Sequence, residues 1–282
     1  MESRPPSIID LNAEVAKLTM FRGLTPQTTR AERLASSALL GPYRDGILFA
    51  AKQAGTSHWE EHPEDELVHV VDGTKTLDIV CGDGPPKSFV LRAGMMVIVP
   101  RSAWHRFRSP EGATSWSATL PGDHIERNVD DPRTAEPEKA RAGGTPCIID
   151  LTAELAKLTM FRGRTPQSTM ADRQGSAARL GSYRDGGLSI TKFAGRGHWE
   201  THLAGDELIH ILDGTATLDI VCDKGPPKSF ALSAGMIAVN PQGAWHRFQS
   251  SEGVTLMAAT PFRGEMIEAD VEDPRTAQPK PA

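Results

Sequence analysis

The segment HWEEHPEDELVHVVDG at residues 58–73 recurs, with one residue inserted, as HWETHLAGDELIHILDG at residues 198–214. The similarity extends well beyond this segment, because AKLTMFRG at residues 16–23 returns unchanged at 156–163. A repeat of this length is one domain long and is not a short solenoid unit. The chain is therefore a tandem duplication, and each copy carries the same group of histidines and glutamates.

The two copies set the expected domain boundaries. We expect a first domain over residues 1–138 and a second over residues 147–282. The segment between them, residues 139–146 (KARAGGTP), is charged, contains two glycines and has no hydrophobic periodicity, which is typical of a linker.

The composition is that of a soluble globular protein rich in turns. Hydrophobic residues make up 39% of the 282 residues and charged residues 24%, while 26 glycines and 21 prolines favour β-structure over a helical bundle. The net charge of −5 gives no electrostatic basis for binding nucleic acid or an anionic membrane. No apolar run is long enough to span a bilayer, and no secretory signal is visible, so a cytoplasmic location is expected.

Each copy reads as one short helix followed by many short strands. Residues 10–18 carry apolar side chains at helical spacing, and the rest alternates between apolar runs and turn residues. Turn residues at such regular intervals predict an all-β sandwich or jelly roll with short flanking helices. The strands expected in the first copy are 46–52, 67–71, 75–80, 87–91, 95–99, 104–107 and 115–119, with Asp72-Gly73 and Glu111-Gly112 as two of the turns.

The histidines and glutamates fall in a pattern that strand geometry can bring together. Side chains alternate between the faces of a strand, so His58, Glu60 and His62 point the same way. Glu66 comes from the next strand, and His105 follows a later turn. By the same alternation His69 faces away from this group.

These residues resemble the two motifs of the cupin superfamily. The first copy reads Glu60-x-His62-x3-Glu66-x6-Gly73 and Gly94-x5-Pro100-x4-His105, and the second copy carries both motifs as well. The resemblance implies a bicupin, that is, two tandem double-stranded β-helix (jelly-roll) barrels. A glutamate stands where the family usually has its first histidine, and Ser102 replaces a motif glycine in the first copy. The metal ligands that the resemblance implies are Glu60, His62, Glu66, His105, Glu200, His202, Glu207 and His246.

Two imidazoles and two carboxylates suit a divalent ion of intermediate hardness. The second carboxylate favours Fe(II) or Mn(II), with Zn(II) and Ni(II) as further candidates. Two alternatives stay open: one glutamate acts as a general base beside the ion, or His58 and His198 replace Glu60 and Glu200 as ligands. A barrel without metal, in which the glutamates form ion pairs, is the plainer interpretation. His58, Phe107, His198 and Phe248 are expected to line the two pockets.

The resemblance implies a metal-dependent enzyme that acts on a small organic molecule. A non-haem dioxygenase is the leading expectation. A lyase, decarboxylase or isomerase that uses the ion as a Lewis acid is the first alternative, and a non-catalytic ligand-binding or sensing bicupin is the second, because one fold hosts many functions. The sequence leaves the substrate and the oligomeric state open, a homo-oligomer included.

Overall fold

The computed structural model describes residues 4–122, 125–127, 129–135, 144–221, 225–262, 266–269, 271–276 and 280–281. The chain divides into two compact units. Barrel one comprises residues 13–152, and barrel two comprises residues 1–12 together with 153–282. Most of the expected linker, residues 139–143, lies outside the described residues.

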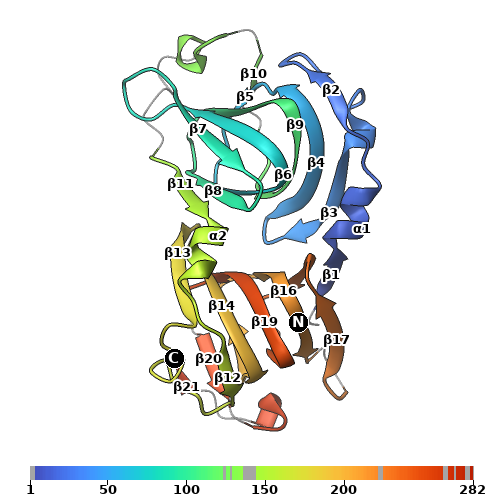
Figure 1. Ribbon diagram of the computed structural model, residues 1–282, viewed down its shortest axis with the longest axis vertical. Coiled ribbons are helices and arrows are strands. Elements are labelled where there is room, and N and C mark those ends of the chain that lie inside the picture. Colours follow the sequence, from blue (N-terminus) through green and yellow to red (C-terminus); the bar gives the residue numbers. More distant parts are fainter. Residues whose placement is uncertain are drawn as a thin grey trace. The chain divides into compact units, whose positions relative to one another are not determined.

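Both units are built almost entirely from strands (Figure 1). The short helices are α1 (Leu11–Ala16) and α2 (Leu151–Ala156), with single 3₁₀ turns at Leu34–Ser36, Pro132–Thr134 and Pro274–Thr276. The strands of barrel one are β2 (Phe21–Leu24), β3 (Ser37–Tyr43), β4 (Gly46–Thr56), β5 (Trp59–Glu60), β6 (Glu66–Ile79), β7 (Lys87–Arg92), β8 (Met95–Val99), β9 (His105–Thr119), β10 (Ile125–Glu126) and β11 (Cys147–Asp150). The strands of barrel two are β1 (Ser7–Asp10), β12 (Phe161–Arg164), β13 (Ala177–Tyr183), β14 (Gly186–Arg196), β15 (Trp199–His202), β16 (Glu207–Ile220), β17 (Lys228–Ser233), β18 (Met236–Asn240), β19 (His246–Pro261), β20 (Met266–Ala269) and β21 (Lys280–Pro281).

The all-β jelly-roll prediction is confirmed. In barrel one, β9 pairs with β4, β5 and β6, and β6 also pairs with β7 and β8. Barrel two repeats this arrangement with β19, β14, β15, β16, β17 and β18. Figure 1 shows β4, β6 and β9 curving around one barrel and β14, β16 and β19 around the other. Alternate side chains of these strands, such as Val68 and Val70 on β6, fill the interior beside Leu77 and Val97.

Two of the turns expected from the sequence are wrong. Asp72-Gly73 lies inside the continuous strand β6, and Glu111-Gly112 lies inside β9. Both mark a shift of register between these two strands. Gly73 has φ +79°, and a Cβ on it would lie 2.3 Å from the carbonyl oxygen of Gly112. A β-bulge therefore uses the same glycines that a hairpin would need, so local composition does not separate the two.

The first strand of each repeat pairs in the barrel formed mainly by the other repeat. Strand β1 pairs antiparallel with β18, joining Ile9 to Ile237. Strand β11 pairs in the same way with β8, joining Ile149 to Met96. Ile9 and Ile149 are both buried, and the adjacent Ile8 packs against the core of barrel two. The compact units therefore differ from the sequence repeats by an exchange of their first segments.

We expect Ile9→Ala to loosen barrel two while leaving barrel one intact. Truncating a buried isoleucine costs about 2 kcal/mol or more, and here the loss falls on the β1–β18 edge. Amide hydrogen exchange should become faster in β18 and stay unchanged in β8. Ile149→Ala is the matched control and should give the opposite pattern. Faster exchange in β8 of the Ile9→Ala variant would contradict the observed pairing.

No helix in the described part of the chain could cross a membrane.

Candidate metal centre

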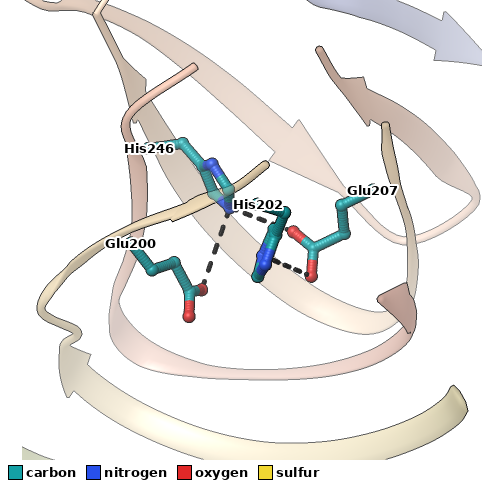
Figure 2. Close-up of side chains that lie close together, drawn as sticks. All are labelled: Glu200, His202, Glu207 and His246. Atoms are coloured by element: carbon teal, nitrogen blue, oxygen red, sulfur yellow. Dashed lines mark hydrogen bonds and ion pairs between the residues drawn. The ribbon is translucent and has the colours of Figure 1, made fainter. Parts of the chain in front are cut away.

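Four side chains converge inside barrel two (Figure 2). Glu200 and His202 lie two residues apart on β15, so both project from the same face of that strand. Glu207 is the first residue of β16, and His246 is the first residue of β19, where it pairs with Glu200. One candidate ligand atom from each residue lies within 4.8 Å of all the others.

The contacts within this cluster join each imidazole to a carboxylate. The Nε2 atom of His246 lies 3.0 Å from Oε2 of Glu207 and 3.8 Å from Oε1 of Glu200. The Nε2 atom of His202 lies 3.3 Å from Oε1 of Glu207. His202, Glu207 and His246 are buried, whereas a quarter of the Glu200 side chain remains exposed. The cluster is thus open to solvent on the side of Glu200.

Neighbouring groups fix the orientation of two members. The Thr260 hydroxyl donates to Oε1 of Glu207 at 2.6 Å, and the Asn240 amide donates to Oε2 at 3.1 Å. His246 Nδ1 lies 3.0 Å from the Ala244 carbonyl oxygen. A carbonyl only accepts, so Nδ1 carries a proton, and Nε2 is the ring atom that faces Glu207. Supports of this kind orient the ligands of metal sites.

The charge balance of the cluster fits a cation. A neutral His246 would place a nitrogen lone pair 3.0 Å from a carboxylate oxygen, which is stable only with a proton or a metal ion between them. Burial raises the pKa of Glu200, but the His198 hydrogen bond and the charges of His246 and His202 outweigh burial and Glu207, and lower it to about 2. Burial likewise raises the pKa of Glu207, but the charges and hydrogen bonds of His202 and His246 outweigh it and hold that pKa well below its usual range. Both carboxylates are therefore anionic, and a divalent ion that replaces the imidazole protons would compensate the same two charges.

A cavity of about 240 Å³ opens onto this cluster. His198 and Phe248, the two residues expected to line this pocket, both face it, together with Glu200, His202 and Glu207. The Nε2 atom of His198 lies 3.6 Å from Oε2 of Glu200. The remaining wall is largely apolar, and two cationic side chains also reach it. These further lining residues include Ile209, Leu256, Ala258, Arg164 and Arg173.

Barrel one contains the corresponding cluster, but only three of its four predicted ligands lie within the same distance limit. Candidate ligand atoms of Glu60, His62 and His105 lie within 4.8 Å of one another. Glu66 falls outside this group, although its Oε2 atom lies 3.1 Å from Nε2 of His105 and 3.9 Å from Nε2 of His62. His105 Nδ1 contacts the Ala103 carbonyl at 2.9 Å, as in barrel two. Of the eight predicted ligands, seven therefore gather as two clusters, and the eighth adjoins one of them.

In barrel one, as in barrel two, interactions between histidines and glutamates shift the pKa values of the cluster. Burial raises the pKa of Glu60, but the His58 hydrogen bond and the charges of His105 and His62 outweigh it and lower that pKa to about 2. Burial lowers the pKa of His105, but the hydrogen bond and charge of Glu66 raise it overall. His58 Nε2 lies 3.5 Å from Oε2 of Glu60, and so occupies the place that His198 has in barrel two.

The structure explains two other features of the first copy, namely Ser102 in place of the motif glycine and His69 outside the cluster. Ser102 adopts the left-handed conformation, φ +57°, that the motif glycine Gly243 adopts in barrel two, φ +76°. Its amide donates to the His62 carbonyl at 2.8 Å, so the loop that presents His105 keeps its shape. His69 accepts a hydrogen bond from the Trp116 indole at 3.1 Å, away from the cluster. Burial lowers the pKa of His69 to about 4, which keeps it neutral.

Comparisons with known proteins agree with this architecture. A family model described as a cupin domain matches residues 48–116. Two similar solved structures are an oxalate decarboxylase studied for its substrate binding mode (13% identity, TM-score 0.50) and the Lactobacillus farciminis oxalate decarboxylase in a formate complex (13%, 0.52). They cover 86% of this chain, and the matches span 73% and 82% of the respective partners. A cupin domain therefore matches the first half of the chain, and the whole chain has the fold of two tandem cupin barrels. No curated protein sequence matches it.

The two clusters also involve residues that the motifs did not predict. Asn240 and Thr260 hold Glu207, but Val99 stands at the place of Asn240 in barrel one. Lys75 enters barrel one from β6, where barrel two has Ala216. An asparagine that ends the apolar strand MIAVN was the available signal for the first of these, because a buried amide needs a partner.

Exchanging Asn240 for the residue of barrel one should weaken cation binding in barrel two. Asn240→Val removes the hydrogen bond to Oε2 of Glu207 and places the strand residue of barrel one there. Loss of such a support typically lowers metal affinity by about 10- to 100-fold. Competition with a chromogenic chelator measures the change. Val99→Asn is the reciprocal variant and should tighten barrel one. An unchanged affinity in Asn240→Val would show that the amide does not orient a ligand.

Proposed function

We propose that this bicupin is a metal-dependent lyase that acts on a small, chelating organic molecule. The observation that carries the proposal is the cluster of Glu200, His202, Glu207 and His246, of which the first three line the barrel-two cavity. These four residues would hold a divalent ion, and Glu60, His62, Glu66 and His105 would hold a second. Mn(II) and Fe(II) suit the mixed imidazole and carboxylate donors best, with Zn(II) and Ni(II) as alternatives.

The number of protein donors favours Lewis-acid chemistry. When bound, the ion would polarise a substrate oxygen and stabilise the negative charge that develops on bond cleavage. Four protein donors would leave fewer free positions on a bound ion than three donors do, and a chelating substrate could occupy them. The two-histidine, one-carboxylate triad of oxygen-activating iron sites leaves more positions open. A chelating substrate would thus fill the remaining positions in barrel two.

The chain's own residues would position the substrate and move a proton. Thr260 and Asn240 hold Glu207 in one orientation, which keeps the ligand set preorganised. Phe248 and Leu256 supply apolar wall that limits water in the cavity. His198 lines the cavity beside the exposed side of Glu200, where its Nε2 atom can give a proton to the cleaved product or take one from the substrate.

The fold is compatible with this chemistry. The two solved bicupin structures described above are oxalate decarboxylases, although their low identity carries the fold alone. The dioxygenase activity expected from the cupin resemblance stays a prediction, as does the non-catalytic alternative. Oxygen consumption and turnover separate the three.

The test begins with protein purified without a metal-affinity tag. Elemental analysis should find a divalent ion at up to two equivalents per chain. The protein is then assayed with small organic acids and diketones, with Mn(II) or Fe(II) supplied, while substrate loss and dissolved oxygen are followed together. We expect substrate loss without oxygen uptake, abolished by a chelator and restored by the ion.

Each contrary outcome points to a different function. Oxygen uptake in proportion to substrate loss would replace the lyase by a dioxygenase. Tight binding of a small molecule without turnover would indicate a sensing module. Absence of metal binding under all conditions would remove the proposed centre.

A further inference from the structure

Barrel one carries a lysine in its interior. Lys75 projects from β6, and its Nζ atom donates to the buried Ser115 hydroxyl at 2.8 Å. The same atom lies 4.7 Å from the centre of the Phe107 ring, whose edge meets the ring of His105. A lysine ammonium has three donors, and Ser115 accepts one of them. The Phe107 ring therefore lies between Lys75 and the ligand cluster, and among the described residues Ser115 takes only one of the three Lys75 donors.

A second cation, Arg33, lies close enough to Lys75 for their like charges to interact. Arg33 acts electrostatically on Lys75 with a like charge, while Glu66 and Glu60 act on it with the opposite charge. The Nε atom of Arg33 is buried without a hydrogen-bond partner among the described residues. Its counterpart in the repeat, Arg173, lines the ligand cavity of barrel two. Two cations held close together, one with an unused buried donor, are costly unless an anion joins them.

Barrel two lacks the lysine and its partner. Ala216 and Leu256 occupy the positions of Lys75 and Ser115, and both are buried hydrophobic residues of the core. The two positions differ together, as an ammonium and hydroxyl in one barrel and two apolar groups in the other. The ligand histidines and glutamates, in contrast, are identical in both. The barrels thus share a metal-binding pattern and differ in what can bind beside it.

We propose that Lys75 and Arg33 form an anion-binding subsite in barrel one, which selects small carboxylates able to chelate the adjacent ion. This inference rests on the proposed function in one respect, because a divalent ion must offset the charges of Glu60 and Glu66. With that offset, the two cations remain to face the bound molecule. A dicarboxylate or an oxo acid would place one oxygen pair on the ion and another carboxylate oxygen on Lys75.

A counter-ion role for Lys75 explains less of the structure. Once a bound ion offsets Glu60 and Glu66, which also contact His58, His62 and His105, the cluster does not need Lys75 as a further cation. Burial lowers the pKa of Lys75 to about 8, and the charge of Arg33 acts in the same direction, against Glu66 and Glu60. The ammonium form still predominates at neutral pH. A cation destabilised in this way gains more from a bound anion than a solvated one would.

The test isolates barrel one in the full-length protein. His202→Ala with His246→Ala removes two ligands of barrel two, and Co(II) is then added as a spectroscopic ion. Malonate is titrated while the visible absorption of bound Co(II) is followed. We expect Lys75→Met, which keeps the length and packing of the side chain, to weaken malonate binding about tenfold. Malonamide, the uncharged analogue, should bind equally to both proteins.

The reciprocal experiment moves the subsite into barrel two. His62→Ala with His105→Ala leaves only the barrel-two cluster, and Ala216→Lys with Leu256→Ser installs the missing pair. This protein should gain affinity for malonate and not for malonamide. If barrel one binds Co(II) and its malonate affinity is unchanged by Lys75→Met, the subsite alone is overturned. Failure of Co(II) to bind would contradict the proposed function and the subsite with it.

Discussion

His246→Ala is expected to abolish cation binding in barrel two. His246 is almost fully buried, and it contacts both carboxylates of the cluster. The variant removes one of four donors and leaves Glu207 and Glu200 with uncompensated charge in a buried place. Losing a group that only supports a ligand already costs about 10- to 100-fold in affinity, so losing the ligand should cost more than about 100-fold. Elemental analysis and chelator competition measure the loss.

The controls for this prediction come from the chain itself. His210→Gln changes another buried histidine of barrel two, on the same strand as Glu207 but outside the cluster, and should retain the ion. His105→Ala should remove the second ion from barrel one. Retention of both ions in a His105→Ala, His246→Ala double variant would mean that the two clusters are not the metal ligands.

The ligand cluster could be predicted from the sequence because each step depends on local rules. Strand alternation places Glu200 and His202 on one face, and the cupin motif relates them to Glu207 and His246. The groups that tune the cluster could not be predicted in this way. Asn240 and Lys75 act across strands, through the register of β18 with β16 and through the curvature of β6, and neither belongs to a motif.

The exchange of first strands was beyond sequence reasoning for a different reason. Residues 8–10 and 148–150 read IID in both copies, so each strand fits the edge of either barrel equally well. Only the path of the chain decides between the two edges. The repeat boundaries at 138 and 147 describe the duplication, whereas the compact units follow the pairing of β1 with β18 and of β11 with β8.

In the long strands β6 and β9, glycines that the sequence predicts as turns lie within continuous strands. Glycine marks both hairpins and bulges, because each needs a positive φ or a close backbone approach. In β6 the strand continues past Gly73, because β9 offers the matching break at Gly112 and pairing resumes at Thr76 with Arg108. Pairing with β9 therefore makes a β-bulge at Gly73, where the local sequence predicts a turn.

His198→Gln is expected to lower turnover by about 10²- to 10⁴-fold while barrel two keeps its ion. His198 is outside the four-residue cluster, but it lines the cavity and contacts the most exposed ligand, Glu200. Glutamine retains a hydrogen-bond donor toward Glu200 and cannot exchange a proton near neutral pH. The steady-state rate with the substrate found in the screen, together with metal content, measures the two effects separately.

The matched variant His58→Gln determines which barrel carries the reaction. His58 contacts Glu60 as His198 contacts Glu200, at 3.5 Å and 3.6 Å. If barrel two is the centre of turnover, His198→Gln alone should slow it, and His58→Gln should leave it near the wild-type rate. The opposite result would move the chemistry to barrel one, beside Lys75. Full activity in the double variant would show that neither histidine moves the proton. Among the described residues, the only other imidazoles at the two clusters belong to the ligands themselves.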